Sequence, residues 1–565
     1  MKFNVSITYN DLFDDFSAVN EKDLIADIPS KDAIQLMSFF LAQIHLAHAD
    51  EALQVELIEF CAQRFPAKLK SKIQDFTNRT VKDKKAEFTF ISNLSGLIFI
   101  ETILENYNEL NTVPDLTPEQ ELNFFKAYLL STQKWIDRQA KITHNIKQFE
   151  TGMDFVKAYL PSHIAFDEFH DIKDFRIQFM KAKYFFEFCE SHSEFKEYLK
   201  IFLAEYNLDS WKTYLKNILS LYVRKFERLK TPSVLNIKSE HPDKINFLKQ
   251  LSLDLSSFAK SDDFLQIREK PVLQVSDNDF VFLNLNFFVD KIYQGIQFDF
   301  AQVLVKNSAT FKGKIIKSRV QFLSIFGEEF SETILFYKVM EYCFGKSGYI
   351  LKPGNELKYY LNDGEPDYYI RDKAKVYLFE FKNVFLAGNV KHNLNYEEIK
   401  AAIFEKLVEN NKGHDKGIKQ LANVIDKIRK KDFNTFDNYN FDESIIYPII
   451  VFTDSSFNTA GVNYLLNEEF RGVLETRDVK RVGNIKKLIM INLDEFIKYQ
   501  DLFKDKKIKL NNLLNEYLEF ILDHKNFSFK FTPFDIFIEN KTNKLNSKLS
   551  ENTIEEIANL LGLEK

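Results

Sequence analysis

Cysteine is scarce in this chain, and long apolar runs are absent. Three of the 565 residues are cysteines, Cys61, Cys189 and Cys343, and they lie far apart in apolar, helix-like contexts. We therefore expect reduced core thiols, and neither a disulfide framework nor a zinc ribbon. No apolar run is long enough to span a bilayer, and residues 1–5 lead into a polar turn rather than a signal peptide. These features predict a cytoplasmic protein without a membrane partner.

Nucleotide-binding motifs are missing as well. The sequence contains neither Gly-x-x-x-x-Gly-Lys-Ser/Thr nor Gly-x-Gly-x-x-Gly, so it gives no case for a motor or enzyme driven by ATP or NAD. It also lacks His-Glu-x-x-His, the pattern of a helix-borne zinc site.

The net charge of −6 does not indicate a nucleic-acid binder, but the charge is unevenly distributed. Residues 301–435 hold 23 Lys and Arg against 17 Asp and Glu, a balance of +6, which leaves −12 for the rest of the chain. A locally basic domain in an acidic protein fits phosphate contacts confined to one face. Lysine-rich surfaces without that role are also common.

The length allows two to four domains, and the patterns along the chain indicate four segments. Residues 1–233 have mostly helical periodicity, and residues 234–319 predict a connecting helix plus a β-hairpin. Residues 320–500 alternate helices with strands, which favours α/β packing around a mixed sheet. Residues 501–565 form a helical and aromatic tail. The helices expected in the first segment are Lys31–Arg64, Gly96–Tyr107, Pro118–Ile142, Phe175–Tyr206 and Ser210–Leu229; the expected hairpin strands are Pro271–Val275 and Phe280–Leu285.

The most informative residues lie on two short β-like runs separated by a polar turn. Asp367 opens the first run, and the second, Lys375–Lys382, ends in Glu380-Phe381-Lys382. Because alternate residues of a strand point to one face, Glu380 and Lys382 project together, and hairpin pairing brings Asp367 close to both. Two carboxylates and an ammonium beside a backbone carbonyl suit Mg²⁺, which binds few carboxylates and keeps several waters. The lysine could orient or deprotonate an attacking water.

The tripeptide alone carries little information. Glu194-Phe195-Lys196 repeats it in a helix-like segment, and a Glu-x-Lys spacing is usually a solvated charge pair. The copy at 380–382 differs because it ends a run of β-formers and follows a Pro-Asp on a run that can pair with it. A helix-like stretch containing Gln420 and an apolar strand at 445–453 come next.

This arrangement, over residues 320–500, resembles the PD-(D/E)xK nuclease superfamily, which has the restriction-endonuclease-like fold. The resemblance implies an αβββαβ core with a mixed sheet. It implies that Asp367 and Glu380 hold Mg²⁺, with Mn²⁺ as an alternative, and that the Phe381 carbonyl is a further metal ligand. Lys382 would act on the attacking water.

Two further positions match the family pattern. A helix opening near Phe326 should carry a glutamate, and Gln420 should support the site from the helix after the hairpin. Glu332 is preferred as the helix acid because it shares a helical face with apolar residues, and Glu329 is the second choice.

The resemblance implies a metal-dependent endonuclease that hydrolyses phosphodiester bonds, with DNA favoured over RNA. The helical N-terminal segment would be a regulator, a sensor or a docking module for a protein partner. A large non-catalytic segment attached to a nuclease domain is common in prokaryotic defence systems against phage and plasmids, which suggests such a role here. Two alternatives stay open: a non-catalytic nucleic-acid-binding or assembly scaffold with the same fold, and a sequence-specific restriction endonuclease. The intact Asp/Glu/Lys trio argues against the scaffold.

Overall fold

The computed structural model describes residues 3–15, 19–47, 50–143, 150–165, 167–169, 172–223, 227–230, 233–361, 364–477, 485–523, 526–542 and 551–562. The chain forms two compact units that do not follow its order. The first comprises residues 1–144, 169–178 and 193–303, and the second comprises residues 145–168, 179–192 and 304–565. The region 1–233 therefore contributes two stretches to the second unit.

The first unit consists mostly of helices with two small sheets. In one sheet β1 (Phe3–Ser6) runs parallel to β2 (Ala86–Thr89), and the other has the order β3-β5-β4. The pairing of β4 (Val272–Gln274) with β5 (Asp279–Phe282) is antiparallel, so the predicted hairpin is confirmed. The remaining elements are α1 (Tyr9–Leu12), α2 (Glu21–Ile25), α3 (Ser30–Leu46), α4 (Glu51–Cys61), α5 (Ala67–Lys82), α6 (Asn93–Glu105), α7 (Pro118–Thr143), α10 (Lys196–Glu205), α11 (Trp211–Tyr222), β3 (Val234–Asn236), α12 (Pro242–Gln250), α13 (Leu265–Glu269) and α14 (Leu285–Asp290). Helices α9 (Phe175–Ser191) and α15 (Gln294–Lys306) begin in the first unit and end in the second.

Two helices that we expected to be continuous are broken. Residues 31–64 divide into α3 and α4, because Asp50 caps α4 by accepting a 2.6 Å hydrogen bond from the backbone N–H of Leu53. Residues 175–206 divide into α9 and α10. There the Ser191 hydroxyl donates to the carbonyl of Phe188 at 3.1 Å, a local bond that competes with helix continuation.

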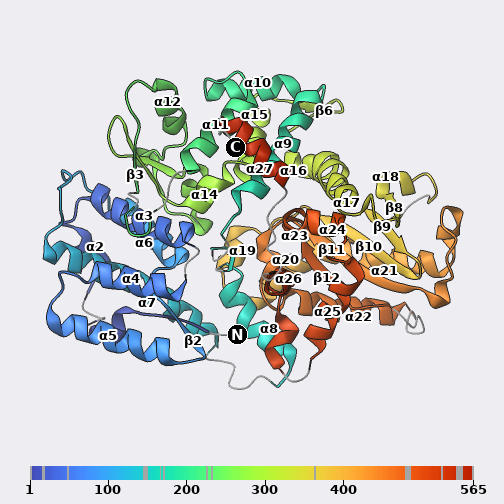
Figure 1. Cartoon of the computed structure of the whole chain (residues 1–565), viewed down its shortest axis with the longest axis horizontal. Coiled ribbons are helices and arrows are strands. Elements are labelled where there is room, and N and C mark those ends of the chain that lie inside the picture. Colours follow the sequence, from blue (N-terminus) through green and yellow to red (C-terminus); the bar gives the residue numbers. More distant parts are fainter. Residues whose placement is uncertain are drawn as a thin grey trace. The chain divides into compact units, whose positions relative to one another are not determined.

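The second unit is built on a five-stranded mixed sheet of order β12-β11-β10-β9-β8 (Figure 1). Strands β8, β9 and β10 form an antiparallel meander, whereas β11 runs parallel to β10 and β12 parallel to β11. A mixed α+β fold is thus established for this unit. The strands are β8 (Ile350–Pro353), β9 (Tyr368–Asp372), β10 (Lys375–Lys382), β11 (Ile445–Phe452) and β12 (Ile489–Asn492).

Helices and a short hairpin complete the second unit. They are α8 (Gly152–His163), β6 (Thr310–Phe311), β7 (Lys314–Ile315), α16 (Arg319–Phe326), the π-helix η5 (Gly327–Phe336), α17 (Tyr337–Phe344), α18 (Gly354–Leu357), α19 (Gly388–His392), α20 (Tyr396–Leu407), α21 (Gly417–Arg429), α22 (Val462–Thr476), α23 (Leu493–Lys498), α24 (Gln500–Lys504), α25 (Leu510–Leu522), α26 (Phe534–Thr542) and α27 (Glu551–Leu561). Within the described ranges, no helix is both long enough and apolar enough to cross a membrane.

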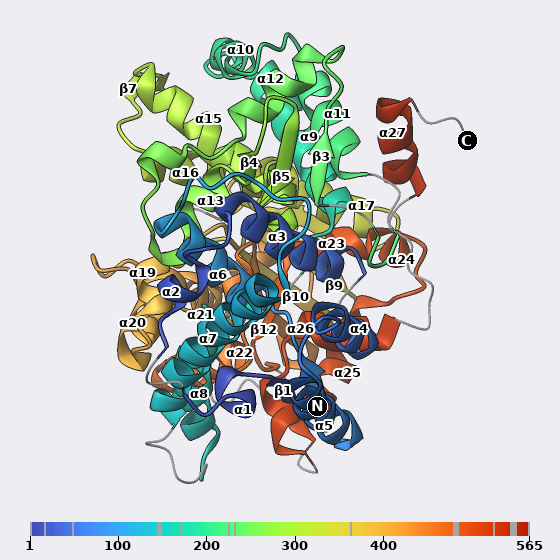
Figure 2. The same ribbon diagram turned by 90° about the vertical axis from the view of Figure 1, so that its left-hand side faces the viewer.

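Helices cover both faces of the sheet. On one face Leu378 and Ile450 are fully buried in a core shared with α20, α21 and α22. On the other face the rings of Phe336 and Phe496 lie 6.5 Å and 6.2 Å from that of Phe379. Figure 2 shows α20, α21 and α22 on one side of β10 and α23, α24 and α25 on the other. This layering buries the apolar side chains of both sheet faces, which is the main stabilising contribution.

The segment carrying the expected helix acid departs from a regular α-helix. Residues 327–336 form a π-helix between α16 and α17. Our choice of Glu332 over Glu329 assumed α-helical spacing, and that assumption is wrong here, because π-helical hydrogen bonds join residues five apart. The rings of Phe322, Phe326 and Phe330 stack in succession, at 5.4 Å and 4.7 Å, along this segment.

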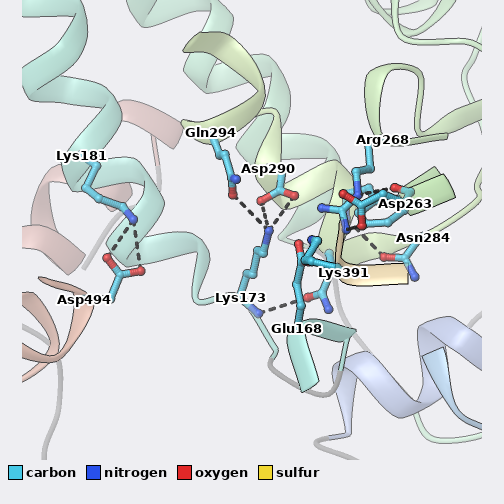
Figure 3. A network of polar contacts seen from close by, with 12 residues as sticks. Glu168, Lys173, Lys181, Asp263, Arg268, Asn284, Asp290, Gln294, Lys391 and Asp494 are labelled. Carbon is cyan, nitrogen blue, oxygen red and sulfur yellow. Dashed lines mark hydrogen bonds and ion pairs between the residues drawn. The ribbon is translucent and has the colours of Figure 1, made fainter. Parts of the chain in front are cut away.

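Buried ion pairs join the early stretches of the second unit to its later part. Lys391 of α19 lies 2.6 Å from Glu168, and Lys181 of α9 lies 2.8 Å from Asp494 (Figure 3). Glu168, Lys181 and Lys391 are each less than one-tenth exposed. Since a buried charge is costly without a partner, these pairs hold Glu168 and α9 to the later part of the unit.

Candidate functional site

The register of β9 and β10 brings the predicted carboxylates to one place. Phe379 pairs with Tyr368, and the continuation of this antiparallel register sets Glu380 opposite Asp367. Directly opposed residues point to the same face of a sheet, and Lys382 shares that face because it lies two residues beyond Glu380. Phe381 points to the other face, where its ring stacks on Phe336 at 5.0 Å.

Two short hydrogen bonds fix these side chains. The backbone N–H of Phe381 donates to Oδ2 of Asp367 at 2.6 Å. The Lys382 ammonium donates to Oε1 of Glu380, also at 2.6 Å. The other carboxylate oxygen of Glu380, Oε2, is buried and has no hydrogen-bond partner. The site thus holds a buried acceptor that no protein group satisfies.

The electrostatics of the trio are those of a crowded anionic site. Burial, followed by the charge of Asp367, raises the pKa of Glu380 to about 8, although Lys382 opposes the shift. Burial also raises the pKa of Asp367, against the opposing effects of Lys382 and the Phe381 N–H. Burial alone would lower the pKa of Lys382, but the neighbouring Glu380 and Asp367 carboxylates outweigh it and the pKa is raised. The two carboxylates therefore favour the ammonium form of Lys382.

The two candidate helix acids have different surroundings. Glu332 lies close enough to the trio that, after burial, the charge of Asp367 is the next largest cause of its raised pKa of about 8. The hydroxyl of Tyr337 is 3.4 Å from Oε1 of Glu332. Glu329 instead forms an ion pair with Lys312. The geometry therefore associates Glu332 with the site and Glu329 with the β6–β7 hairpin.

Helix α21 approaches the same face of the sheet. A side chain at Gly417 would lie 3.3 Å from the Ile450 side chain, and Ile450 pairs with Glu380 across β10 and β11. The structure places Gln420 one turn further along α21, with its Oε1 buried and without a hydrogen-bond partner. No hydrogen bond joins Gln420 to Asp367, Glu380 or Lys382, so a supporting role for it stays a prediction.

The residues present can be tested for their fit to a divalent cation. Carboxylate oxygens suit Mg²⁺ and Mn²⁺, and the unsatisfied Oε2 of Glu380 is the acceptor that a cation would use. Across the part of the chain that the structure describes, no three His, Cys, Asp or Glu side chains are grouped to hold a metal ion by themselves. The fit is therefore that of a site with two protein carboxylates, Asp367 and Glu380, completed by water. A ligand role for the Phe381 carbonyl stays a prediction.

Sequence reasoning missed a polar link beside the site. The amide nitrogen of Asn383 donates to Ser331 Oγ at 3.2 Å, and its amide oxygen accepts a 2.7 Å bond from the Thr453 hydroxyl. The link joins η5, next to Glu332, to the carboxyl ends of β10 and β11. A usable signal existed, because Asn383 directly follows Lys382 and Thr453 is the last residue of the predicted strand.

A second missed residue is Lys358, just after α18. It lies 3.6 Å from Glu365, and its positive charge partly offsets the rise in the pKa values of Asp367 and Glu332. Nothing in its sequence context marks it as part of the site.

Comparison with known proteins adds no relative. No protein-family model, no curated protein and no solved structure matches this chain. The chemistry of the site is therefore the basis on which a function can be assigned.

Proposed function

We propose that the second unit carries a metal-dependent phosphodiesterase site and that the protein is an endonuclease acting on DNA. The observation that carries the proposal is the buried, unsatisfied Oε2 of Glu380 beside the opposed carboxylate of Asp367 and the ammonium of Lys382. A purely structural ion pair would gain nothing from a second buried acid and an unpaired buried oxygen, which destabilise the fold. Such an arrangement is typical of a site tuned for a ligand.

The order of elements supports the same proposal. A helical segment (α16, η5 and α17) is followed by the β8–β9–β10 meander, by α20 and α21, and by the parallel strand β11. This order is compatible with the αβββαβ core that the resemblance to the PD-(D/E)xK superfamily implies, with Asp367 and Glu380 at the β-ribbon. The third strand of the meander is β8, for which the sequence analysis had predicted no residues.

Each side chain has a role that its surroundings favour. Asp367 and Glu380 would hold the cation, and a bound Mg²⁺ supplies a Lewis acid and lowers the pKa of its water. Lys382 is held as an ammonium by two carboxylates, so we assign it the orientation of the attacking water and the offset of negative charge on the phosphate.

The direct test is cleavage of plasmid DNA by the purified full-length chain with Mg²⁺, with Mn²⁺ and with EDTA. We expect cleavage that needs the metal, and we expect it to disappear in Asp367→Asn and in Lys382→Ala. Lys196→Ala is the matched control, because Lys196 ends the second Glu-Phe-Lys copy and is exposed at the start of α10. Cleavage that survives both substitutions would remove the assignment.

Further arms of the assay separate the neighbouring assignments. A smear indicates unspecific cleavage, whereas discrete bands favour a sequence-specific restriction enzyme. Faster cleavage of RNA than of DNA would overturn the choice of substrate. If the wild type binds nucleic acid but cleaves none under any metal condition, the non-catalytic scaffold is the better description.

A further inference from the structure

A strongly basic surface precedes the helix that carries Glu332. Residues 306–319 contain five Lys and Arg and no Asp or Glu. All five basic residues are exposed in the structure. They are Lys306, Lys312, Lys314, Lys317 and Arg319.

Two of these cations, Lys312 and Lys314, lie on a defined β-hairpin formed by β6 and β7, and Lys317 and Arg319 follow it. Thr310 pairs with Ile315 and Phe311 with Lys314 in antiparallel register. The turn between them has positive φ at both Lys312 (+48°) and Gly313 (+75°), the pattern of a two-residue type I′ turn. Such a turn matches the twist of the strands, so the ribbon does not depend on a ligand for its shape.

The hairpin is anchored to the second unit on its inner side. The side chain of Phe311 is buried, and its ring is stacked on that of His192 with centroids 6.0 Å apart. The carbonyl of Ala309 accepts a 2.8 Å hydrogen bond from the N–H of Ile316. Lys312 forms its ion pair with Glu329 of η5, the π-helix that also carries Glu332. The basic ribbon is thus attached directly to an element of the candidate site.

Part of this charge has no protein partner. Lys314 and Lys317 form no ion pair with any residue that the structure describes, and no acid lies in the surrounding sequence to neutralise them. Unpaired like charges on a fixed frame repel one another, and an anion relieves that repulsion. Two unpaired cations, one on the hairpin and one just after it, can contact successive charges of a repeating anion.

We propose that the β6–β7 hairpin, with the flanking Lys317 and Arg319, is a contact surface for the phosphate backbone of duplex nucleic acid. The proposal rests on the proposed function, because the ribbon belongs to the unit that holds Asp367 and Glu380 and contacts η5, the element that carries Glu332. Lysine contacts to phosphate carry no base information, so this surface binds duplexes irrespective of sequence. A two-stranded ribbon also has the size that a DNA major groove admits.

The test measures binding without catalysis. Full-length Lys382→Ala protein in EDTA is titrated against two unrelated fluorescent 30-bp duplexes over a series of salt concentrations. The double substitution Lys314→Gln/Lys317→Gln is compared with Lys506→Gln/Lys509→Gln, which removes two exposed lysines elsewhere in the same unit. Each lost phosphate contact lowers the slope of log K against log[salt] by about 1 in magnitude. We expect a decrease of about 2 for the hairpin variant on both duplexes, and no change for the control.

Each other outcome overturns the inference. An unchanged slope in the hairpin variant, or an effect on one duplex alone, removes the phosphate-backbone assignment. Equal losses in both double variants would indicate a diffuse charge effect. Binding to vesicles rich in phosphatidylserine that depends on Lys314 and Lys317, without duplex binding, would assign the surface to a membrane. Thermal melts of both variants verify that folding is intact.

The two proposals can fail separately. If the protein cleaves DNA but the slope of log K against log[salt] is the same with and without Lys314 and Lys317, the nuclease assignment stands. The proposed phosphate-contact role of the hairpin is then rejected. A protein that cleaves nothing but shows the expected change in slope keeps the ribbon as a nucleic-acid surface and loses the catalytic site.

Discussion

Glu380 and Lys382 form a buried ion pair along one strand, with the Lys382 ammonium 2.6 Å from Oε1 of Glu380 and the Glu380 side chain 1% exposed. The pair satisfies only one of the two carboxylate oxygens. Because removing either partner leaves an uncompensated charge, the pair couples the charge state of the site to the stability of the unit.

This coupling predicts a pH-dependent effect of Lys382→Ala. The Glu380 pKa is raised from 4.5 to about 8, so the folded state binds more protons than the unfolded state between these values. Stability contributed by this group is present below pH 4.5 and is lost as the pH rises through about 8. Loss of the ammonium raises this pKa further, so the variant should lose more stability at pH 8.5 than at pH 5.5. Urea denaturation at both pH values measures this.

The quantity to compare is the difference in the free energy of unfolding between Lys382→Ala and the wild type at each pH. Burial, with Asp535 nearby, also raises the pKa of Glu495 in the same unit to about 8, so the wild type has a pH dependence of its own. Lys196→Ala should follow the wild type at both values. An equal loss at pH 5.5 and 8.5 in Lys382→Ala would show that Glu380 is not coupled to the ammonium.

Substitutions of Glu332 and Glu329 should affect the cleavage rate differently. Glu332→Gln removes a carboxylate whose charge acts on the trio, so we expect metal-dependent cleavage to fall about 10- to 100-fold, the range for groups just outside a metal site. Glu329→Gln breaks only the pair with Lys312 and should stay near wild type. The initial cleavage rate as a function of Mg²⁺ concentration is the measurement. Equal rates for the two variants would remove Glu332 from the site.

Asn383 should act as a positioning residue. Asn383→Ala removes both the bond to Ser331 and the bond from Thr453, which should lower the free energy of unfolding by about 1–3 kcal/mol and reduce cleavage. Thr453→Val breaks one of these bonds, and Thr453→Ser keeps its hydroxyl as the matched control. A full cleavage rate in Asn383→Ala, despite the lost stability, would confine the residue to a structural role.

Substitution of Gln420 tests its role in cleavage without an expected loss of stability. Its Oε1 is buried without a partner, so Gln420→Met, of similar length, should leave the stability unchanged or raise it. Cleavage should nevertheless fall if the amide serves the site. Thermal unfolding and cleavage rate measured on one preparation distinguish these effects. A stable variant with the wild-type rate would exclude Gln420 from the mechanism.

Local patterns were enough to place the β-ribbon. The β-formers before Glu380 and the apolar run of β11 became strands near the predicted bounds, and a short turn joins β9 to β10. In contrast, β8 is a four-residue strand, Ile350–Pro353, that contains a lysine and ends in proline, so its own sequence gives almost no strand signal. It exists because β9 offers it a partner.

Non-local contacts account for the rest of what the sequence did not indicate. The link from Ser331 through Asn383 to Thr453 joins residues from three separate parts of the chain. Their positions next to predicted elements were visible in the sequence, but no local pattern shows that the three side chains meet. No local sequence pattern predicts the π-helix at 327–336 either, although it begins at Gly327 and the stacked rings of Phe322, Phe326 and Phe330 lead into it. Tertiary packing decides both features.

The central claim is that Asp367 and Glu380 share one cation, and anomalous X-ray scattering from crystals saturated with Mn²⁺ tests it most directly. The account predicts an anomalous peak within about 2.0–2.3 Å of an oxygen of each carboxylate, with the remaining ligands supplied largely by water. A well-ordered site that shows no peak at saturating Mn²⁺, with the Glu380–Lys382 pair intact, would contradict it.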